Sequence, residues 1–228
     1  MKWIFLILTI SVLTSYGQYN LPLSYSHQQT IRQLGNYRAM GDFSTKGSGA
    51  SQNFNVHHYK CDWSVNPADH YIKGSVDVAF QTTQDAEFIA LDLNDSLRVD
   101  SIVFKSSRLS FLHEQNGLKI DFGYSLPAME NASVTIYYQG RPPVNGFGSF
   151  TTSTHSGIPV MWTLSEPYGS RDWWPCKDGL QDKADSIDVF ITAPEIYTSV
   201  SNGVRVQQTA VNGWKTTHWK HRYPITTY

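Results

Sequence analysis

Cysteine is scarce in this chain, and so is charge of one sign. Two cysteines, Cys61 and Cys176, are too few for the dense disulfide framework of many small exported proteins. They can pair only if the fold brings their Cα atoms within about 7 Å, so a disulfide and two separate buried thiols both stay open. The 18 basic and 19 acidic residues nearly cancel and form no basic stripe, which argues against nucleic acid as a partner.

Catalytic motifs are missing as well. The chain has no H-E-x-x-H zinc motif and no G-x-S-x-G nucleophile elbow. Its densest group of possible metal ligands is HHYKCD (57–62), but neighbouring residues of a strand point to opposite faces, and no second cluster completes the site. We therefore predict no catalytic residue, no metal ligand and no cofactor site in this chain.

Long apolar runs are absent except at the N-terminus. Lys2 precedes the apolar run WIFLILTISVL (3–13), which is short for a bilayer span, and Ser15 and Gly17 place small residues at a cleavage position. We interpret residues 1–17 as a signal peptide, with the mature chain starting at Gln18 and no stable membrane span after cleavage. The predicted location is therefore secreted or periplasmic; an uncleaved anchor is the alternative.

What the chain has in quantity is short alternating segments. In YIKGSVDVAFQ (71–81) the apolar residues fall at every second position, which is typical of a strand with one buried face. Similar segments occur at 86–93, 98–104, 117–122, 132–140 and 185–194, and no stretch keeps a helical period over three turns. This pattern predicts an all-β fold, a saddle-like β-sandwich of mostly antiparallel strands.

The chain divides into three parts on composition. The signal peptide is followed by a polar lead-in segment (18–53) that ends in STKGSGASQNF, and the strand pattern occupies 54–228. The composition of THWKHRYPITTY (217–228) is strand-like up to its last residue. A natural terminus and a sequence cut inside a domain both fit that ending, so a complete domain and one that is incomplete at its C-terminal end both stay open.

One stretch carries a more specific pattern. Residues 160–194 place Thr163, Glu166, Arg171, Pro175, Cys176 and Asp178 at fixed spacing, followed by the strand SIDVFITAP (186–194). This order resembles the end of the N-terminal β domain of the aminopeptidase N family of zinc exopeptidases, whose pattern is roughly T-Q-x-E-x-x-x-A-R-x-x-x-P-C-x-D. The resemblance extends over about 54–228.

The resemblance implies a role for one residue. The glutamate that matches Glu166 projects toward the catalytic domain in such enzymes and helps to bind the free α-amine of the substrate. An ammonium group that enters a dry cleft needs a fixed counter-charge, which gives this role a physical reason. The family glutamine is replaced by Leu164 here, which removes one side-chain hydrogen-bonding group. Arg171 and Asp178 are expected to fix the loop through buried or half-buried ion pairs, and Pro175–Cys176 to lie in the core.

The resemblance also implies partners and a cofactor. The family's zinc ligands, its glutamate base and its transition-state tyrosine belong to a catalytic domain that would follow residue 228. We expect this chain to act with that domain on peptide N-termini, with zinc in the missing domain, and to be inactive alone. PAMEN (127–131) is similar to the family's G-x-M-E-N motif, but it precedes the 163–178 region, so we interpret it as a turn.

A second hypothesis belongs to another class of function. A free-standing secreted β-sandwich could bind carbohydrate or protein through exposed aromatic side chains. The candidates are Trp173, Trp174, Tyr168 and Trp214.

Overall fold

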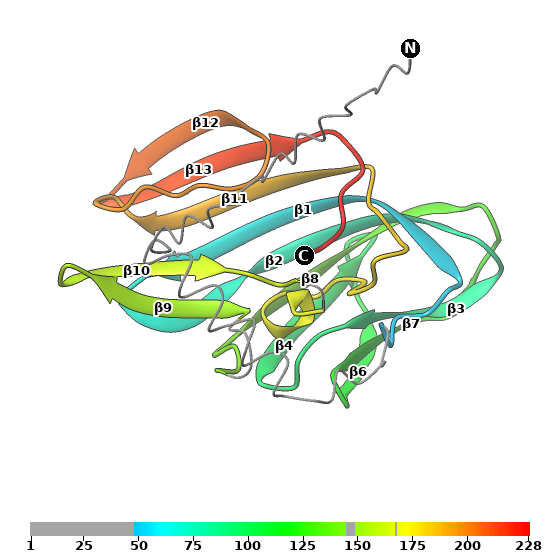
Figure 1. Cartoon of the computed structure of the whole chain (residues 1–228). Coiled ribbons are helices and arrows are strands. Elements are labelled where there is room, and N and C mark those ends of the chain that lie inside the picture. Colours follow the sequence, from blue (N-terminus) through cyan, green and yellow to red (C-terminus); the bar gives the residue numbers. More distant parts are fainter. Residues whose placement is uncertain (1–47, 145–148, 167) are drawn as a thin grey trace, which may run out of the picture.

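An eight-stranded sheet is the centre of the protein in the computed structural model, which describes residues 48–144, 149–166 and 168–228 (Figure 1). Its strand order is β12-β13-β11-β1-β2-β8-β4-β5. The bounds are β1 (Phe54–Asn66), β2 (Asp69–Thr82), β4 (Leu97–Phe104), β5 (Ser107–Arg108), β8 (Asn131–Gly140), β11 (Ser186–Pro194), β12 (Val204–Val211) and β13 (Trp214–His221). β1 and β11 run parallel, and every other neighbouring pair is antiparallel.

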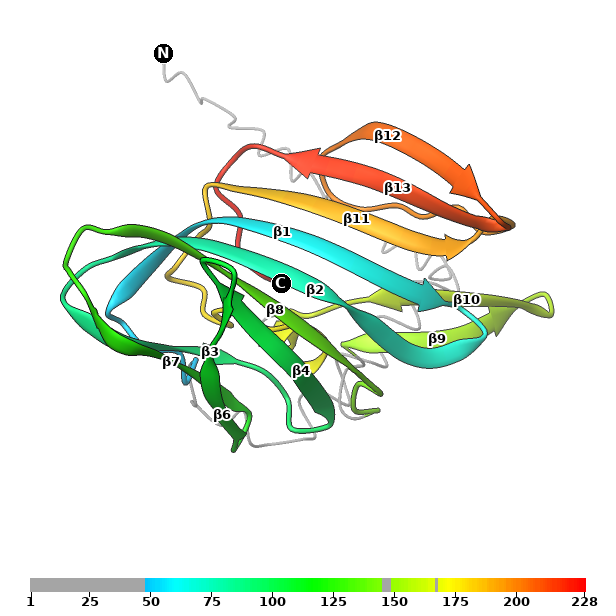
Figure 2. The same cartoon turned by 180° about the vertical axis from the view of Figure 1, so that it is seen from behind.

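Two smaller sheets accompany the large one. The first contains β3 (Ala86–Asp92), β7 (Gly117–Leu126) and β6 (Ser110–Glu114), and the second is the hairpin of β9 (Phe150–His155) and β10 (Ile158–Thr163). Figures 1 and 2 show them beside different parts of the large sheet. The described residues contain no α-helix, only the 3-10 turn η1 (Ser170–Asp172). The all-β prediction is confirmed.

The core lies between the large sheet and the three-stranded sheet. Val76, Val78 and Phe80 of β2 are buried on one face, as the period of two predicted. Phe122 of β7 packs against Phe80 and Phe104, with ring centroids 6.2 and 5.2 Å apart. Alternation along β2 places Ile72 on this same face, so the large sheet has one apolar side that extends beyond the three-stranded sheet.

Both turns predicted from Asn-Gly dipeptides are present, and one of them lies one residue earlier than predicted. Asn212 and Gly213 join β12 to β13 with φ values of 52° and 79°, the left-handed conformation that Asn-Gly favours. At the predicted Asn116–Gly117 turn, the two left-handed residues are Gln115 and Asn116, with φ of 53° and 59°. Gly117 is the first residue of β7, so the sequence prediction was one residue late.

The C-terminal stretch differs from its sequence interpretation. β13 ends at His221, and the rest of the chain forms only an isolated bridge between Ala184 and Ile225. Pro224 explains the interruption, because proline donates no hydrogen bond and restricts the residue before it. PAMEN (127–131) forms the connection between β7 and β8, as predicted, and Met129 there has a φ of 65°.

A charged network joins the parallel strands on the polar face of the sheet. Asp188 of β11 contacts His58 Nε2 of β1 at 3.4 Å, His218 Nε2 at 2.5 Å and Lys220 Nζ at 3.3 Å, the last two from β13. Burial alone would raise the pKa of Asp188, but hydrogen bonds from His218 and Lys220 lower it overall. The network therefore connects three adjacent strands through one carboxylate.

Candidate functional site

Glu166 lies in the turn that follows β10, and its side chain is exposed. The residue before it, Ser165, is buried. A strand end followed by a short loop is a common place for functional side chains, because the sheet holds the loop while the tip stays accessible. The structure thus puts the predicted substrate-binding residue on the surface, at the end of the β9–β10 hairpin.

The base of this loop is held by hydrogen bonds on both sides of Glu166. The Trp173 indole Nε1–H donates to Ser165 Oγ at 2.9 Å. The backbone N–H of Gly169 donates to Ser165 O at 2.9 Å, and that of Leu164 donates to Ser149 O at 3.1 Å. The backbone around Glu166 is therefore fixed by the core, which is the arrangement a preorganised charge requires.

The following 3-10 turn is tied to two other loops. Asp172 accepts hydrogen bonds from Ser149 Oγ at 2.8 Å and from Asn94 Nδ2 at 3.2 Å. The backbone N–H of Asn94 donates to Arg171 O at 2.8 Å. These bonds connect the loop to the β3–β4 connection and to the start of β9.

The two adjacent tryptophans form part of the core. Trp173 is 8% and Trp174 2% exposed. Their rings contact Trp63 with centroids 4.7 and 5.8 Å apart, and Trp174 also contacts Tyr59 at 5.0 Å. The second hypothesis therefore loses two of its four exposed aromatics; Tyr168 and Trp214 remain accessible, at 38% and 42%.

Arg171 and Asp178, which were expected to form buried or half-buried ion pairs, pair with each other. Arg171 Nε lies 3.8 Å from Asp178 Oδ2, and the carboxylate is 1% exposed. The backbone N–H of Asp178 donates to Asp92 Oδ2 at 2.9 Å, which brings a second buried carboxylate close. Burial raises the pKa of Asp178 to about 6; Arg171 lowers it, and the charge of Asp92 raises it.

The raised pKa of Asp178 predicts a pH dependence of stability. Because the folded pKa of about 6 exceeds the unfolded value of 3.8, the folded protein binds more protons between these values. The unfolding free energy should fall by up to about 3 kcal/mol as pH rises from about 4 to 6. Urea unfolding at several pH values measures it. In Asp178→Asn this pH-dependent change of the unfolding free energy should be absent, whereas the variant of an exposed residue, Glu114→Gln, should keep it. Equal slopes of the unfolding free energy against pH in all three proteins would contradict the assignment.

The structure answers the cysteine question that the sequence left open. Cys61 and Cys176 are free and fully buried. Burial raises the pKa of both thiols well above the usual value, so neither is an activated nucleophile. Pro175 and Cys176 are buried as expected, and the backbone of Cys176 bridges to Asp92.

The HHYKCD stretch does not assemble a metal site. His57 Nδ1 contacts Asp185 at 3.0 Å, and His58 Nδ1 lies 2.8 Å from Ser186 Oγ. Among residues 48–144, 149–166 and 168–228, no group of three or more His, Cys, Asp or Glu side chains is arranged to hold a metal ion. In that same part of the chain, none of the helical segments has the length and apolar character needed to cross a bilayer.

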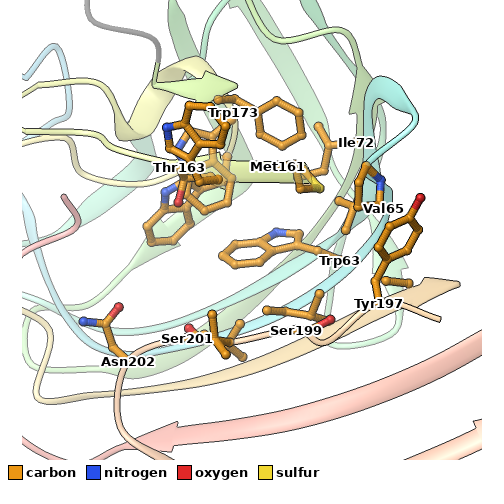
Figure 3. Close-up of a pocket in the computed structure, with 18 of the residues that line it drawn as sticks. Trp63, Val65, Ile72, Met161, Thr163, Trp173, Tyr197, Ser199, Ser201 and Asn202 are labelled. Atoms are coloured by element: carbon orange, nitrogen blue, oxygen red, sulfur yellow. The ribbon is translucent and has the colours of Figure 1, made fainter. Parts of the chain in front are cut away.

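A groove beside the loop is the feature that sequence reasoning missed. It encloses about 660 Å³ between β10, the apolar face of the large sheet, the segment 196–202 and residues 225–228. Figure 3 shows Trp63, Trp173 and Met161 around it, with Tyr197, Ser199 and Ser201 on the opposite wall. Thr163 lines the groove, but Glu166 does not. Its residues come from segments far apart in the sequence, so no local pattern indicates it.

Comparison with known proteins assigns a family to this architecture. Residues 55–228 match the family model described as the Peptidase M1 N-terminal domain. No curated protein matches the chain. The M1 zinc metallopeptidase of Deinococcus radiodurans, solved with a Tyr-Ser-Ala substrate, is 25% identical with a TM-score of 0.70, and the match covers 78% of this chain and 41% of that one.

A more distant solved structure has the same fold. Native yeast LTA4 hydrolase is 20% identical with a TM-score of 0.68, and the match covers 84% of this chain and 31% of that one. The structure of a two-domain M1 zinc metallopeptidase with bound L-arginine gives 25% identity and a TM-score of 0.70. The chain thus spans less than half the length of the solved relatives it matches.

Proposed function

Because the chain belongs to the Peptidase M1 N-terminal domain family, we propose that it is the N-terminal part of a zinc aminopeptidase in which Glu166 binds the α-ammonium group of the substrate. The observation that carries the proposal is the position of Glu166, exposed at the end of a loop whose base is buried and hydrogen-bonded. The substrate class is peptides with a free N-terminus. The peptide bound to the Deinococcus radiodurans relative supports that class.

The chemistry assigned to this chain is binding rather than bond cleavage. A carboxylate held at a fixed point accepts charge-assisted hydrogen bonds from an ammonium group and orients the first residue of the peptide. The zinc of the family supplies the hydrolytic chemistry when bound. The described residues do not fit that ion, since they offer no cluster of ligands. We place it in the part of the parent protein that corresponds to the unmatched length of the relatives.

Two further parts of the proposal concern context. The partner of this domain is the catalytic domain of the same polypeptide, which is consistent with the two-domain relative. Export through residues 1–17 remains a proposal based on the apolar run and the small residues before Gln18, and these residues lie outside the described part of the chain.

The proposal is tested by metal content and turnover. The purified 228-residue chain is expected to keep no stoichiometric zinc after dialysis and to leave aminoacyl anilides intact. The longer parent should bind zinc, cleave these substrates, lose activity to a chelator and regain it with added zinc. Elemental analysis and an absorbance assay measure both. Stoichiometric zinc in the isolated chain, or zinc-independent cleavage by the parent, would overturn the assignment.

A further inference from the structure

Three Asn-Gly dipeptides lie in the part of the chain that the structure describes, and their asparagines are Asn116, Asn202 and Asn212. A further one begins at Asn145, outside the described residues. In an Asn-Gly dipeptide the backbone nitrogen of glycine can attack the asparagine amide, because glycine has no side chain to hinder the approach. The attack forms a succinimide ring and releases ammonia, and hydrolysis of the ring leaves aspartate or isoaspartate. By sequence the three are equivalent, so the local structure decides which of them reacts.

Asn116 is held by the β3–β4 connection. Its backbone N–H donates to Asp95 Oδ1 at 2.9 Å, and its side-chain Oδ1 accepts from the backbone N–H of Asp95 at 3.1 Å. Its carbonyl oxygen accepts from the Leu93 N–H at 3.0 Å. The attacking nitrogen is held as well, because Gly117 pairs with Glu114 across a two-residue turn, where facing residues exchange N–H···O bonds. Ring closure at Asn116 therefore requires hydrogen bonds to break first.

Asn212 has none of these restraints. It is exposed in the turn between β12 and β13, and neither its side-chain amide nor the N–H of Gly213 has a hydrogen-bond partner among the described residues. Figure 1 shows this hairpin at the outer edge of the large sheet. All eight residues of β12 are exposed, so little packing opposes a rearrangement of the turn. The amide and the nitrogen that attacks it are therefore both available.

Asn202 is an intermediate case. Its side chain is exposed, but the backbone of Gly203 packs directly against β13 and has a φ of 89°. A side-chain carbon at Gly203 would lie 2.2 Å from Lys220 O, so there is no free space between the two backbones. The Gly203 nitrogen therefore cannot move toward the Asn202 amide without changing this contact.

We propose that Asn212 is a modification site of the folded protein, at which the asparagine is converted to aspartate or isoaspartate through a succinimide. The bond from Gly213 N to Asn212 Cγ forms while the bond from Cγ to the amide nitrogen breaks, and the Gly213 proton leaves with the ammonia. Water then opens one of the two ring carbonyls, so the reaction needs no other reagent. The new carboxylate lies within residues 196–228, which contain four Lys and Arg residues and no acidic residue. Isoaspartate also lengthens the main chain by a methylene group, which alters the geometry of the two-residue turn.

Timed incubation of the 228-residue chain in mildly alkaline buffer tests the proposal. Digestion and mass spectrometry follow the replacement of each amide by an acid. The amide of Asn212 should be lost about 10-fold faster than that of Asn116, which has hydrogen bonds to break, and also faster than that of Asn202. The same incubation in concentrated urea is the control. There the three asparagines should react at similar rates, because each precedes glycine and the protection by structure is gone.

Several results would overturn the proposal. They are an absence of conversion at Asn212 in the folded chain, equal rates at Asn212 and Asn116 there, and a difference between the two that persists in urea. Asp95→Ala removes the acceptor of the Asn116 N–H and should raise the rate at Asn116 but not at Asn212; an unchanged rate at Asn116 would refute the protection by Asp95. Asn212→Gly keeps a residue that tolerates the left-handed turn and removes the amide. This variant should therefore lose the time-dependent gain of negative charge at the hairpin. The test uses no turnover, so its result is independent of the proposed function.

Discussion

Replacement of Glu166 by glutamine in the longer parent protein is expected to lower kcat/KM for aminoacyl anilides by about 10- to 100-fold, with a rise in KM. The substitution keeps the size of the side chain and removes its charge. The loss corresponds to one charge-assisted hydrogen bond, which contributes about 1.5–3 kcal/mol. Because the ammonium group is bound in both the ground state and the transition state, a substantial part of the effect should be in KM. Steady-state kinetics at a fixed pH measures it.

The control for this variant is another exposed glutamate of the same domain. Glu87 lies on β3, in the three-stranded sheet, and its side chain is exposed. Glu87→Gln changes the net charge by the same amount and should leave both kinetic constants within twofold. A substrate whose α-amine is blocked provides a second comparison, since any residual cleavage of it should not respond to Glu166→Gln. Unchanged kinetics for Glu166→Gln would remove the assigned role.

Replacement of Trp173 by alanine is expected to cost about 3–5 kcal/mol of unfolding free energy, the range for truncating a buried tryptophan. The side chain is 8% exposed, contacts Trp63 and donates the hydrogen bond to Ser165 that holds the Glu166 loop. Truncation of the Trp173 side chain therefore leaves a cavity and removes the hydrogen-bond donor of the Ser165 hydroxyl in the same place. Chemical denaturation monitored by circular dichroism measures the change.

An exposed tryptophan serves as the control, because it distinguishes the effect of burial on stability from the effect of the residue type. Trp214 of β13 is 42% exposed, so Trp214→Ala should cost less than about 1 kcal/mol. Trp173→Phe is an intermediate case, because it keeps most of the apolar volume but removes the indole donor. It should retain more stability than Trp173→Ala while loosening the loop at Ser165. Equal losses for Trp173→Ala and Trp214→Ala would show that Trp173 is not a core residue in solution.

Alternation of apolar residues was enough to predict four strands of the large sheet, β2, β4, β8 and β11. The buried face of 71–81 was correctly assigned because a half-exposed strand has a local signature. The β9–β10 hairpin carries Thr and Ser with half-exposed faces, so FTTSTH (150–155) has no clear period. The parallel pairing of β1 with β11 was also beyond local reasoning, because it joins segments far apart in the chain.

In the candidate site, too, the sequence indicated some residues but not the contacts that hold them. Glu166, Arg171 and Asp178 were found because a family pattern fixes their spacing, and the structure places the last two in contact. That the loop rests on the Trp173–Ser165 hydrogen bond could not be inferred, since indole contacts depend on the packed core. The groove was missed for the same reason, because it is formed by side chains from segments that lie far apart in the sequence.

The parallel junction between β1 and β11 has a consequence for the order of folding. His58 and Ser186, which pair across it, are 128 residues apart in the chain. Among the strands of the described residues, β11, β13 and β12 are joined to the rest of the large sheet only through β1. A contact between residues so far apart in the sequence forms late in folding, because the chain loses the entropy of closing a long loop before the contact contributes stabilisation. We therefore expect the β2–β8–β4 side to form first during synthesis, and the β11–β13–β12 side to be the cooperative unit that opens first in the folded protein.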